Sequence, residues 1–287
     1  MKIVIKPFAI LFFMFAILLP VSSFAGFWSV TPTMADVAYG SDPAQVMDVY
    51  LPNEARNAPV IFMVHGGAWK TGDKASRSVV QNKVKRWVKK GFIFVSINNR
   101  LMPEAKPLAQ ADDVRLALAF AQQHAAEWGG DAAQFIVMGH SAGAHLVSLV
   151  STTPALAAKK GVQPWLGTIA LDSAAYDVDA IMREGKPKRF YQQAFGDKPF
   201  YWKRASPIHQ LAEKTVPFLA VCSAKRKDGA CEQARAFVQK AKTYGSAAKV
   251  LPVNLSHRKI NQSLGKNNAY TDAVERFMKT ISPKLPM

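Results

Sequence analysis

The pentapeptide Gly139-His140-Ser141-Ala142-Gly143 places a serine between two glycines, a pattern that can present a hydroxyl nucleophile. It follows the apolar segment 134–138 and precedes the small-residue segment 142–151, which predicts a strand, a sharp turn and a helix. Glycine permits the close backbone approach that this turn requires. We therefore expect Ser141 at the carboxyl end of a strand, beside helix N-terminal N–H groups that stabilise negative charge on a substrate oxygen. The alternative is a glycine-bearing packing turn.

A second glycine motif, HGGAW at 65–69, comes directly after the apolar segment 60–64. Paired glycines let backbone N–H groups approach a ligand closely. The N–H of Ala142 and those of Gly66 or Gly67 could converge on one substrate oxygen, which predicts an oxyanion hole.

Three larger side chains lie in or next to these motifs. Trp69 either lines the substrate pocket or packs the glycine loop, and His140 is expected to line the pocket beside the nucleophile. His65 is expected to shape the loop through a hydrogen bond rather than to take part in the chemistry.

A serine hydroxyl attacks an ester only when a base accepts its proton, and histidine is the usual base near neutral pH. Of the six histidines, only His257 follows the last predicted strand, 249–253. In the chain order nucleophile, acid, base, a loop histidine after the final core strand is the expected base. His257 is therefore our candidate, against the alternative of an exposed loop histidine. The other histidines are His65, His124, His140, His145 and His209.

The acid that orients the base should lie between Ser141 and His257, just past the next-to-last strand. Asp228 meets this condition and is the first candidate. Asp172 also ends a predicted strand and is the second. The cations at 225–227 flank Asp228 and are expected to keep its pKa low.

Two cysteines bracket this acid loop, Cys222 at a strand end and Cys231 at the start of a helix. In an oxidising compartment they can form a disulfide that limits the freedom of the loop. The alternative is two separate buried thiols. Their nine-residue separation with no nearby histidine pair does not predict a zinc site, and we expect no metal and no cofactor.

The elements that must position these residues alternate along the chain, because short β-branched or aromatic segments are followed by longer helical ones. This alternation predicts an α/β fold with a mostly parallel sheet flanked by helices. The expected strands are 46–51, 60–64, 92–97, 134–138, 168–171, 216–222 and 249–253, with an N-terminal hairpin from 36–39 to 46–51. The expected helices are 76–90, 109–128, 142–151, 230–244 and 269–281.

The chain has 287 residues, of which 49% are hydrophobic and 20% charged, with a formal net charge of +17. These values are typical of a globular protein and exclude collagen-like, coiled-coil and disordered classes. The basic clusters lack an aromatic-interleaved or known nucleic-acid motif, so we expect solvated faces and no nucleic-acid partner; weak attraction to anionic surfaces is the alternative.

Residues 1–25 carry two early lysines, an apolar run and a Ser-Phe-Ala end, which predict a cleavable signal peptide. The apolar run is shorter than the roughly 20 residues that span a bilayer, and an uncleaved membrane anchor is the alternative. We therefore expect export to the periplasm or the medium, and one domain over 26–287.

These motifs together resemble the α/β-hydrolase superfamily, and within it the hormone-sensitive-lipase-like carboxylesterases and the arylformamidases. The similar segments are HGGAW at 65–69, INNRLMPEA at 97–105, GGDAAQFIVMGHSAGAHL at 129–146, KRKDGACEQA at 225–234 and LSHRKIN at 255–261. The resemblance implies nucleophile Ser141, acid Asp228, base His257 and oxyanion donors Gly66, Gly67 and Ala142. It also implies a structural ion pair of Arg100 with Asp112 or Asp113.

The reaction predicted from these residues is hydrolysis of carboxylic esters through an acyl-enzyme. Segment 173–210 is rich in aromatic residues and either forms a lid-like insertion over the pocket or packs over the sheet. Formamide or other amide hydrolysis is the second hypothesis. A catalytically inactive binding module on the same fold is the third.

Overall fold

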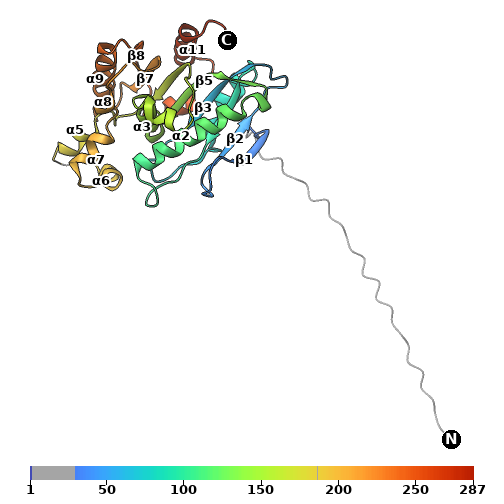
Figure 1. The fold of residues 1–287 in the computed structure, drawn as a ribbon, viewed down its shortest axis with the longest axis horizontal. Helices are drawn as coiled ribbons and strands as arrows, with labels where there is room; N and C mark the ends of the chain where they lie inside the picture. Colours follow the sequence, from blue (N-terminus) through green and yellow to red (C-terminus); the bar gives the residue numbers. More distant parts are fainter. Residues whose placement is uncertain (2–29, 186) are drawn as a thin grey trace.

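One twisted sheet forms the centre of the molecule (Figure 1). The computed structural model describes Met1, residues 30–185 and residues 187–287. The strands are β1 (Met34–Ala38), β2 (Val46–Tyr50), β3 (Ala58–Val64), β4 (Ile93–Ile97), β5 (Gly130–His140), β6 (Gly167–Leu171), β7 (Phe218–Ser223) and β8 (Ala248–Val253). Their order across the sheet is β1-β2-β4-β3-β5-β6-β7-β8.

Only the β1 edge of this sheet is antiparallel. β1 pairs with β2 and β2 with β4 in antiparallel register, whereas every pair from β4 to β8 is parallel. Parallel strands covered on both faces read as continuous apolar runs, and all seven residues of β3 are buried. The predicted mostly parallel sheet with an N-terminal hairpin is confirmed.

Helices cover both faces of the sheet. On one face, α1 (Arg77–Trp87) and α11 (Ala269–Ile281) share a core with Ile61 and Met63 of β3. On the other, α2 (Pro107–His124) and α3 (Ala142–Ser151) pack against the alternate β3 residues. Successive strand side chains point to opposite faces, which is why one strand supplies two cores. Further along the second face, α9 (Ala230–Thr243) packs on β7.

The shorter helices include several that sequence periodicity did not predict. They are η1 (Ala126–Trp128), α4 (Pro154–Lys159), α5 (Val178–Arg183), α6 (Arg189–Phe195), α7 (Pro199–Arg204), α8 (Pro207–Gln210) and α10 (His257–Ser263). Helices of three to seven residues are too short to display a 3.6-residue pattern. Across the described ranges, none of the helices has both the length and the apolar character needed to span a bilayer.

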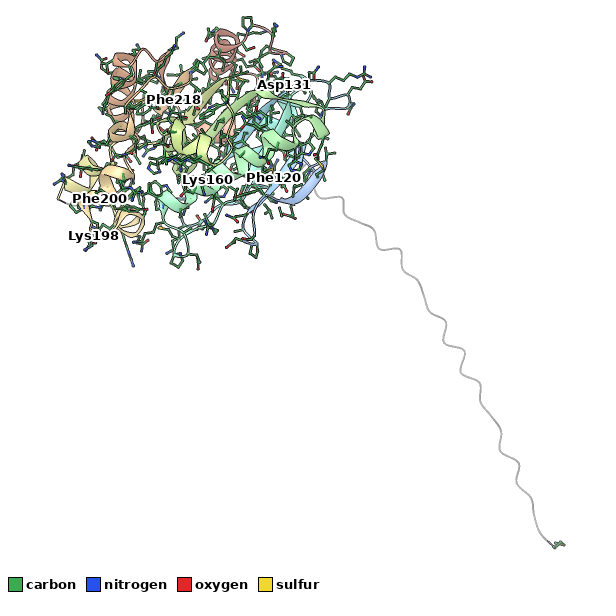
Figure 2. The ribbon with its side chains drawn as sticks, viewed as in Figure 1. Phe120, Asp131, Lys160, Lys198, Phe200 and Phe218 are labelled. Atoms are coloured by element: carbon green, nitrogen blue, oxygen red, sulfur yellow. A yellow bond between two sulfur atoms is a disulfide. The ribbon has the colours of Figure 1, made fainter. Side chains whose placement is uncertain are left out.

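Residues 173–185 and 187–210 form an insertion between β6 and β7, which we call the cap segment. It carries α5 to α8, and α7 and α8 each begin with a proline, whose fixed φ suits the first helical position. Its outer end bears Lys198 and Phe200, and the Phe200 side chain is 73% exposed (Figure 2). The expected signal peptide lies, apart from Met1, outside the described residues.

Candidate active site

Ser141 occupies the sharp turn between β5 and α3, with φ 56° and ψ −116°. This left-handed φ is rare outside glycine and marks a strained position. The flanking glycines are required by packing: a Cβ on Gly139 would lie 2.4 Å from the Gly143 oxygen, and one on Gly143 would lie 2.4 Å from the Val64 oxygen. The Ser141 backbone N–H donates to the Leu171 oxygen at 2.9 Å, which fixes the turn to the end of β6.

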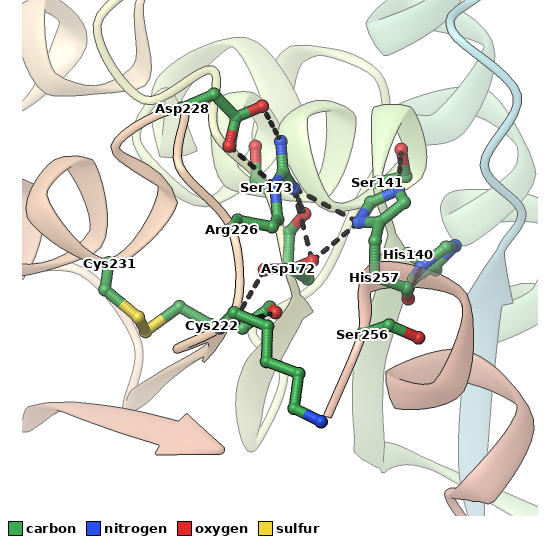
Figure 3. Close-up of polar contacts among 12 residues, drawn as sticks. His140, Ser141, Asp172, Ser173, Cys222, Arg226, Asp228, Cys231, Ser256 and His257 are labelled. Atoms are coloured by element: carbon green, nitrogen blue, oxygen red, sulfur yellow. Dashed lines mark hydrogen bonds and ion pairs between the residues drawn. A yellow bond between two sulfur atoms is a disulfide. The ribbon is translucent and has the colours of Figure 1, made fainter. Parts of the chain in front are cut away.

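His257 is brought to this turn by α10, of which it is the first residue. Its Nε2 lies 3.0 Å from the Ser141 hydroxyl oxygen (Figure 3). Ser256 caps the helix by accepting a hydrogen bond from the Lys259 N–H. The expected base is therefore within hydrogen-bond reach of the expected nucleophile, although it begins a helix rather than lying in a loop.

The carboxylate that contacts His257 belongs to Asp172 and not to Asp228. Asp172 follows β6, and its Oδ2 lies 2.6 Å from His257 Nδ1. Its Oδ1 accepts the Ser223 N–H at 2.7 Å, and its side chain is fully buried. Because a carboxylate only accepts, His257 Nδ1 must donate, which leaves Nε2 to accept the Ser141 proton.

Asp228, the first candidate for the acid, is occupied elsewhere, so that expectation is wrong. Its two carboxylate oxygens accept hydrogen bonds from Arg226 Nε at 2.8 Å and Nη2 at 2.7 Å (Figure 3). Lys188 of the cap segment adds an ion pair at 3.0 Å. The Arg226 hydrogen bonds hold the pKa of Asp228 well below its usual range. Asp228 is therefore paired with Arg226, and the carboxylate in contact with His257 is that of Asp172.

The ionised state of Asp172 is stabilised despite its burial. Desolvation alone raises the pKa of this carboxyl, but the hydrogen bond from His257 and the positive charge of Arg226 outweigh it. The pKa of Asp172 therefore lies below its usual value. An ionised acid is what keeps the imidazole in the tautomer described above and stabilises it when it becomes charged.

The glycine loop after β3 closely approaches the nucleophile. A Cβ on Gly66 would lie 2.8 Å from both the Ser141 Cβ and the His140 oxygen, so only glycine fits there. Gly67 has φ 137°, a conformation that favours glycine. As the first residue of α3, Ala142 has a backbone N–H with no partner within the helix.

His65 shapes this loop, as the sequence predicted. Its Nδ1 lies 2.8 Å from the Gly66 oxygen, and burial lowers the pKa of the imidazole. A Cβ on Gly72 would lie 2.2 Å from the same Nδ1, so the loop closes tightly around the ring.

A cavity of about 710 Å³ opens beside Ser141. Gly66, Gly67 and Ala142 contribute to its lining, as do both sequence-predicted pocket residues, Trp69 and His140. The cap segment adds Phe190 and Tyr191, and Arg226, Asp228 and Asn261 complete part of the wall.

The sequence left two alternatives for Trp69, and the structure shows both: its side chain lines the cavity and also packs against the glycine loop. Its indole N–H donates to His145 Nδ1 at 3.2 Å, and His145 Nε2 lies 2.7 Å from the Ala205 oxygen. The Trp69 ring also contacts Phe195 edge to face, with centroids 4.8 Å apart. Burial lowers the pKa of His145 to about 4, so this neutral imidazole joins α3 to the cap segment.

Two buried groups behind the site hold α10 in place. His140 Nε2 lies 3.1 Å from the His257 backbone oxygen, and burial lowers the pKa of His140 to about 3. Lys83 of α1 is 1% exposed, and its Nζ donates to the Asn261 backbone and side-chain oxygens at 2.8 and 2.7 Å and to the Ser78 oxygen at 3.1 Å. These contacts fix the helix that begins with His257.

Two further sequence expectations are met. Cys222 and Cys231 form a disulfide across the loop that carries Arg226 and Asp228. Arg100 pairs with Asp113 at 2.6 Å, away from the reacting groups. The alternative partner, Asp112, binds Arg115 instead.

The structure also brings in residues that sequence reasoning did not assign to the site. Arg226 was considered only as one of three flanking cations, and its position between two carboxylates depends on the β6 and β7 loops meeting in space. Lys83 lies in the expected helix 76–90 and Asn261 ends the segment LSHRKIN, but neither segment indicates that the two side chains meet. Tyr191 was visible only as one aromatic residue among many in the cap segment.

This arrangement, a serine on a strand-to-helix turn with a histidine and a buried carboxylate at the same sheet edge, defines the α/β-hydrolase class. The family model BD-FAE matches residues 47–241, which is more than half of the chain. The chain therefore belongs to the BD-FAE family.

Relatives of known name include esterases and a formamidase. Esterase LipQ of Mycobacterium tuberculosis is 30% identical over 228 residues, which are 74% of this chain and 53% of that protein. Esterase LipC of the same organism is 28% identical over 218 residues, 71% of this chain and 54% of that protein. Kynurenine formamidase of Danio rerio is 29% identical over 155 residues, 54% and 50% of the two chains. This chain spans about half the length of these relatives.

Solved structures share the fold at low sequence identity. A truncated carbohydrate esterase from gut microbiota superposes with a TM-score of 0.73 at 20% identity, covering 89% of this chain and 98% of that one. The apo form of esterase 2 of Thermogutta terrifontis superposes with a TM-score of 0.67 at 22% identity, covering 82% of this chain and 89% of that one. The α/β-hydrolase fold expected from the motifs is thereby confirmed.

Proposed function

We propose that this protein is an exported serine hydrolase that cleaves small carboxylic esters through an acyl-enzyme, with Ser141 as nucleophile, His257 as base and Asp172 as acid. The observation that carries the proposal is the continuous contact from Asp172 Oδ2 through His257 to the Ser141 hydroxyl, at 2.6 and 3.0 Å. The esterase names of the relatives support the same class of reaction.

In the first half of the reaction, His257 Nε2 takes the hydroxyl proton as the Ser141 oxygen attacks the ester carbonyl carbon. The backbone N–H groups of Ala142 and of Gly66 or Gly67 are the proposed donors to the resulting oxyanion. The protonated imidazole then gives its proton to the departing alkoxide, which leaves as the alcohol.

In the second half, water attacks the Ser141 acyl ester with His257 again as base, and the carboxylic acid is released. Asp172 stays ionised and holds the imidazole in place throughout. This chemistry draws on side chains and backbone of the chain alone, and the proposal includes no cofactor.

The aromatic wall of the cavity supports a substrate with a small acyl or aryl group. Trp69, Phe190 and Tyr191 stand on the side of the cap segment, and aromatic surfaces of this kind bind apolar groups. The apolar run within residues 1–25 supports export to the periplasm or the medium.

Formamide hydrolysis is the second candidate, because one relative is named a kynurenine formamidase and the same three groups can cleave an N-formyl bond. A panel of p-nitrophenyl esters of graded acyl length and an N-formyl arylamide, assayed with the purified protein, separates the two. An esterase hydrolyses the esters faster, and a formamidase the arylamide.

Ser141→Ala tests the proposal against an inactive binding module. We expect this variant to stay folded and to lose nearly all turnover. Ser41→Ala, on the exposed turn between β1 and β2, is the matched control and should retain full activity. Turnover that survives Ser141→Ala, or that is missing from the unaltered protein, would refute the proposed function.

A further inference from the structure

Arg226 lies at the centre of the charged groups behind His257. It stands on the loop between β7 and α9, which the Cys222–Cys231 disulfide closes. Its side chain is 17% exposed, so its hydrogen bonds are formed largely out of water. Charge-assisted bonds in such a setting are among the strongest in proteins.

The guanidinium joins two carboxylates. On one edge, Nε and Nη2 bind both oxygens of Asp228. On the other, Nη1 donates to the Asp172 backbone oxygen at 3.0 Å and to its Oδ2 at 3.2 Å. The planar fork of arginine is needed for this, because a lysine ammonium cannot span both partners in fixed geometry.

Asp172 Oδ2 accepts hydrogen bonds from both Arg226 Nη1 and His257 Nδ1 (Figure 3). Arg226 Nη1 also lies 3.1 Å from His257 Nδ1, and since both nitrogens carry protons, this is a close approach of two donors. They tolerate it because they share one anionic acceptor. The direction in which the Asp172 carboxylate faces therefore depends on Arg226 as well as on the Ser223 N–H.

Arg226 also reaches the cap segment. Asp228, held by Arg226, pairs with Lys188 of this segment at 3.0 Å. Tyr191 and Lys188 both line the cavity. One side chain thus connects the carboxylate behind the base with the wall that faces the substrate.

We propose that Arg226 is a positioning residue of the active site, which orients Asp172 toward His257 and ties this pair to the cap segment through Asp228 and Lys188. This inference rests on the proposed ester hydrolysis. A merely structural arginine would stabilise the loop without setting the geometry of the acid.

The test is a cycle of Arg226→Met, Asp172→Asn and the double variant, assayed on a p-nitrophenyl ester and checked for folding by circular dichroism. We expect Arg226→Met to lower kcat about 10- to 100-fold, as small misplacements of reacting groups do, with a smaller change in KM. The double variant should be no slower than Asp172→Asn alone, because Arg226 acts through Asp172. Losses that multiply, or an unchanged kcat for Arg226→Met, would overturn the proposal.

Arg226→Lys keeps the charge and should recover part of kcat. Asp228→Asn, which weakens the hold on the guanidinium, gives a second route if Arg226→Met does not fold, and should also lower kcat. Arg235→Met is the matched control, because this α9 arginine is exposed and pairs with the exposed Glu232 at 3.7 Å. It should keep the activity of the unaltered protein.

The pH–rate profile adds a readout that loop stability does not move. The groups facing the imidazole are Ser141, Asp172, His140 and Arg226, with Lys83 beyond His140. Removing the Arg226 charge favours the protonated ring, so the acidic limb should move to higher pH in Arg226→Met and stay in place in Arg226→Lys. An acidic limb unchanged in Arg226→Met contradicts the proposal.

A measurement without turnover separates this inference from the proposed function. The proton between His257 Nδ1 and Asp172 gives a low-field ¹H resonance, which should shift in Arg226→Met and persist in Arg235→Met. If the unaltered protein hydrolyses no ester, the proposed function fails, and this resonance still decides the role of Arg226: a shift supports it and an unchanged signal overturns it.

Discussion

Asp172 and His257 are 85 residues apart in the chain, and their side chains meet at 2.6 Å. The contact joins the end of β6 to the start of α10, across β7 and β8. Because parallel strands end at one edge of the sheet, residues that follow different strands can converge there.

This contact makes the two aspartates unequal under substitution. Asp172→Asn should lower kcat by about 10⁴-fold, because the amide no longer fixes the imidazole tautomer. Asp228→Asn should cost only about 3- to 10-fold, since Asp228 touches Arg226 and not the base. Steady-state kinetics on one ester measures both. If Asp228→Asn lowers kcat more than Asp172→Asn does, Asp228 and not Asp172 is the acid.

Gly66 offers a steric test of the proposed oxyanion hole. In Gly66→Ala the new Cβ would lie 2.8 Å from the Ser141 Cβ and from the His140 oxygen, so the loop or the serine must move. Loss of one oxyanion donor lowers kcat about 100- to 1,000-fold. Gly245→Ala is the control: its Cβ meets nothing within 4 Å, and its φ of 76° carries a stability cost but no contact with the site. Equal kcat in the two variants would argue against the assignment.

The disulfide should contribute both stability and loop order. Closing a loop of this length stabilises the folded state by roughly 2 to 3 kcal/mol in the chain-entropy account. The free energy of unfolding of the double variant Cys222→Ala/Cys231→Ala should therefore be lower by that amount, and its unfolding midpoint should lie at a lower denaturant concentration. Chemical unfolding of both proteins measures it, and coincident transitions would show that the bond adds nothing. The loop also holds Arg226, so we expect kcat to fall in the same variant.

Lys83 predicts a pH dependence of stability. Burial lowers its pKa to about 7 in the folded protein, against an ordinary value of 10.5. Between these pH values the unfolded chain binds more protons than the folded one, so the free energy of unfolding rises with pH, by at most about 1.4 kcal/mol per pH unit. The gain is complete above 10.5 and is lost as the pH falls to 7.

Lys83→Met removes this contribution. Denaturant unfolding between pH 7 and pH 9.5 should show a steeper rise in stability for the unaltered protein than for the variant, since all other groups are shared. Parallel curves would mean that the lysine titrates alike in both states.

Much of the fold could be predicted from the sequence, because apolar runs and helical periods are local signals. Strand β3 and helix α3 were placed nearly to the residue, and the glycines around Ser141 indicated the turn between β5 and α3. The start of β5 at Gly130 was missed, since its first residues are mostly small and polar and carry no strand pattern.

The choice between Asp172 and Asp228 could not be made locally. Both follow a strand of the sheet, and chain order admits both. What decides is Arg226, two residues before Asp228, whose guanidinium occupies that carboxylate. A sequence shows the cation beside the acid but not which partner it takes in three dimensions.

The C-terminal residues of the chain pack away from the cavity. Pro286 lies beside Gly91, just before β4 begins, and Leu285 is buried next to the same region. The cavity, in contrast, opens where the strands end. A fusion partner or a solid support attached through the C-terminus should therefore leave the entrance for incoming molecules unobstructed.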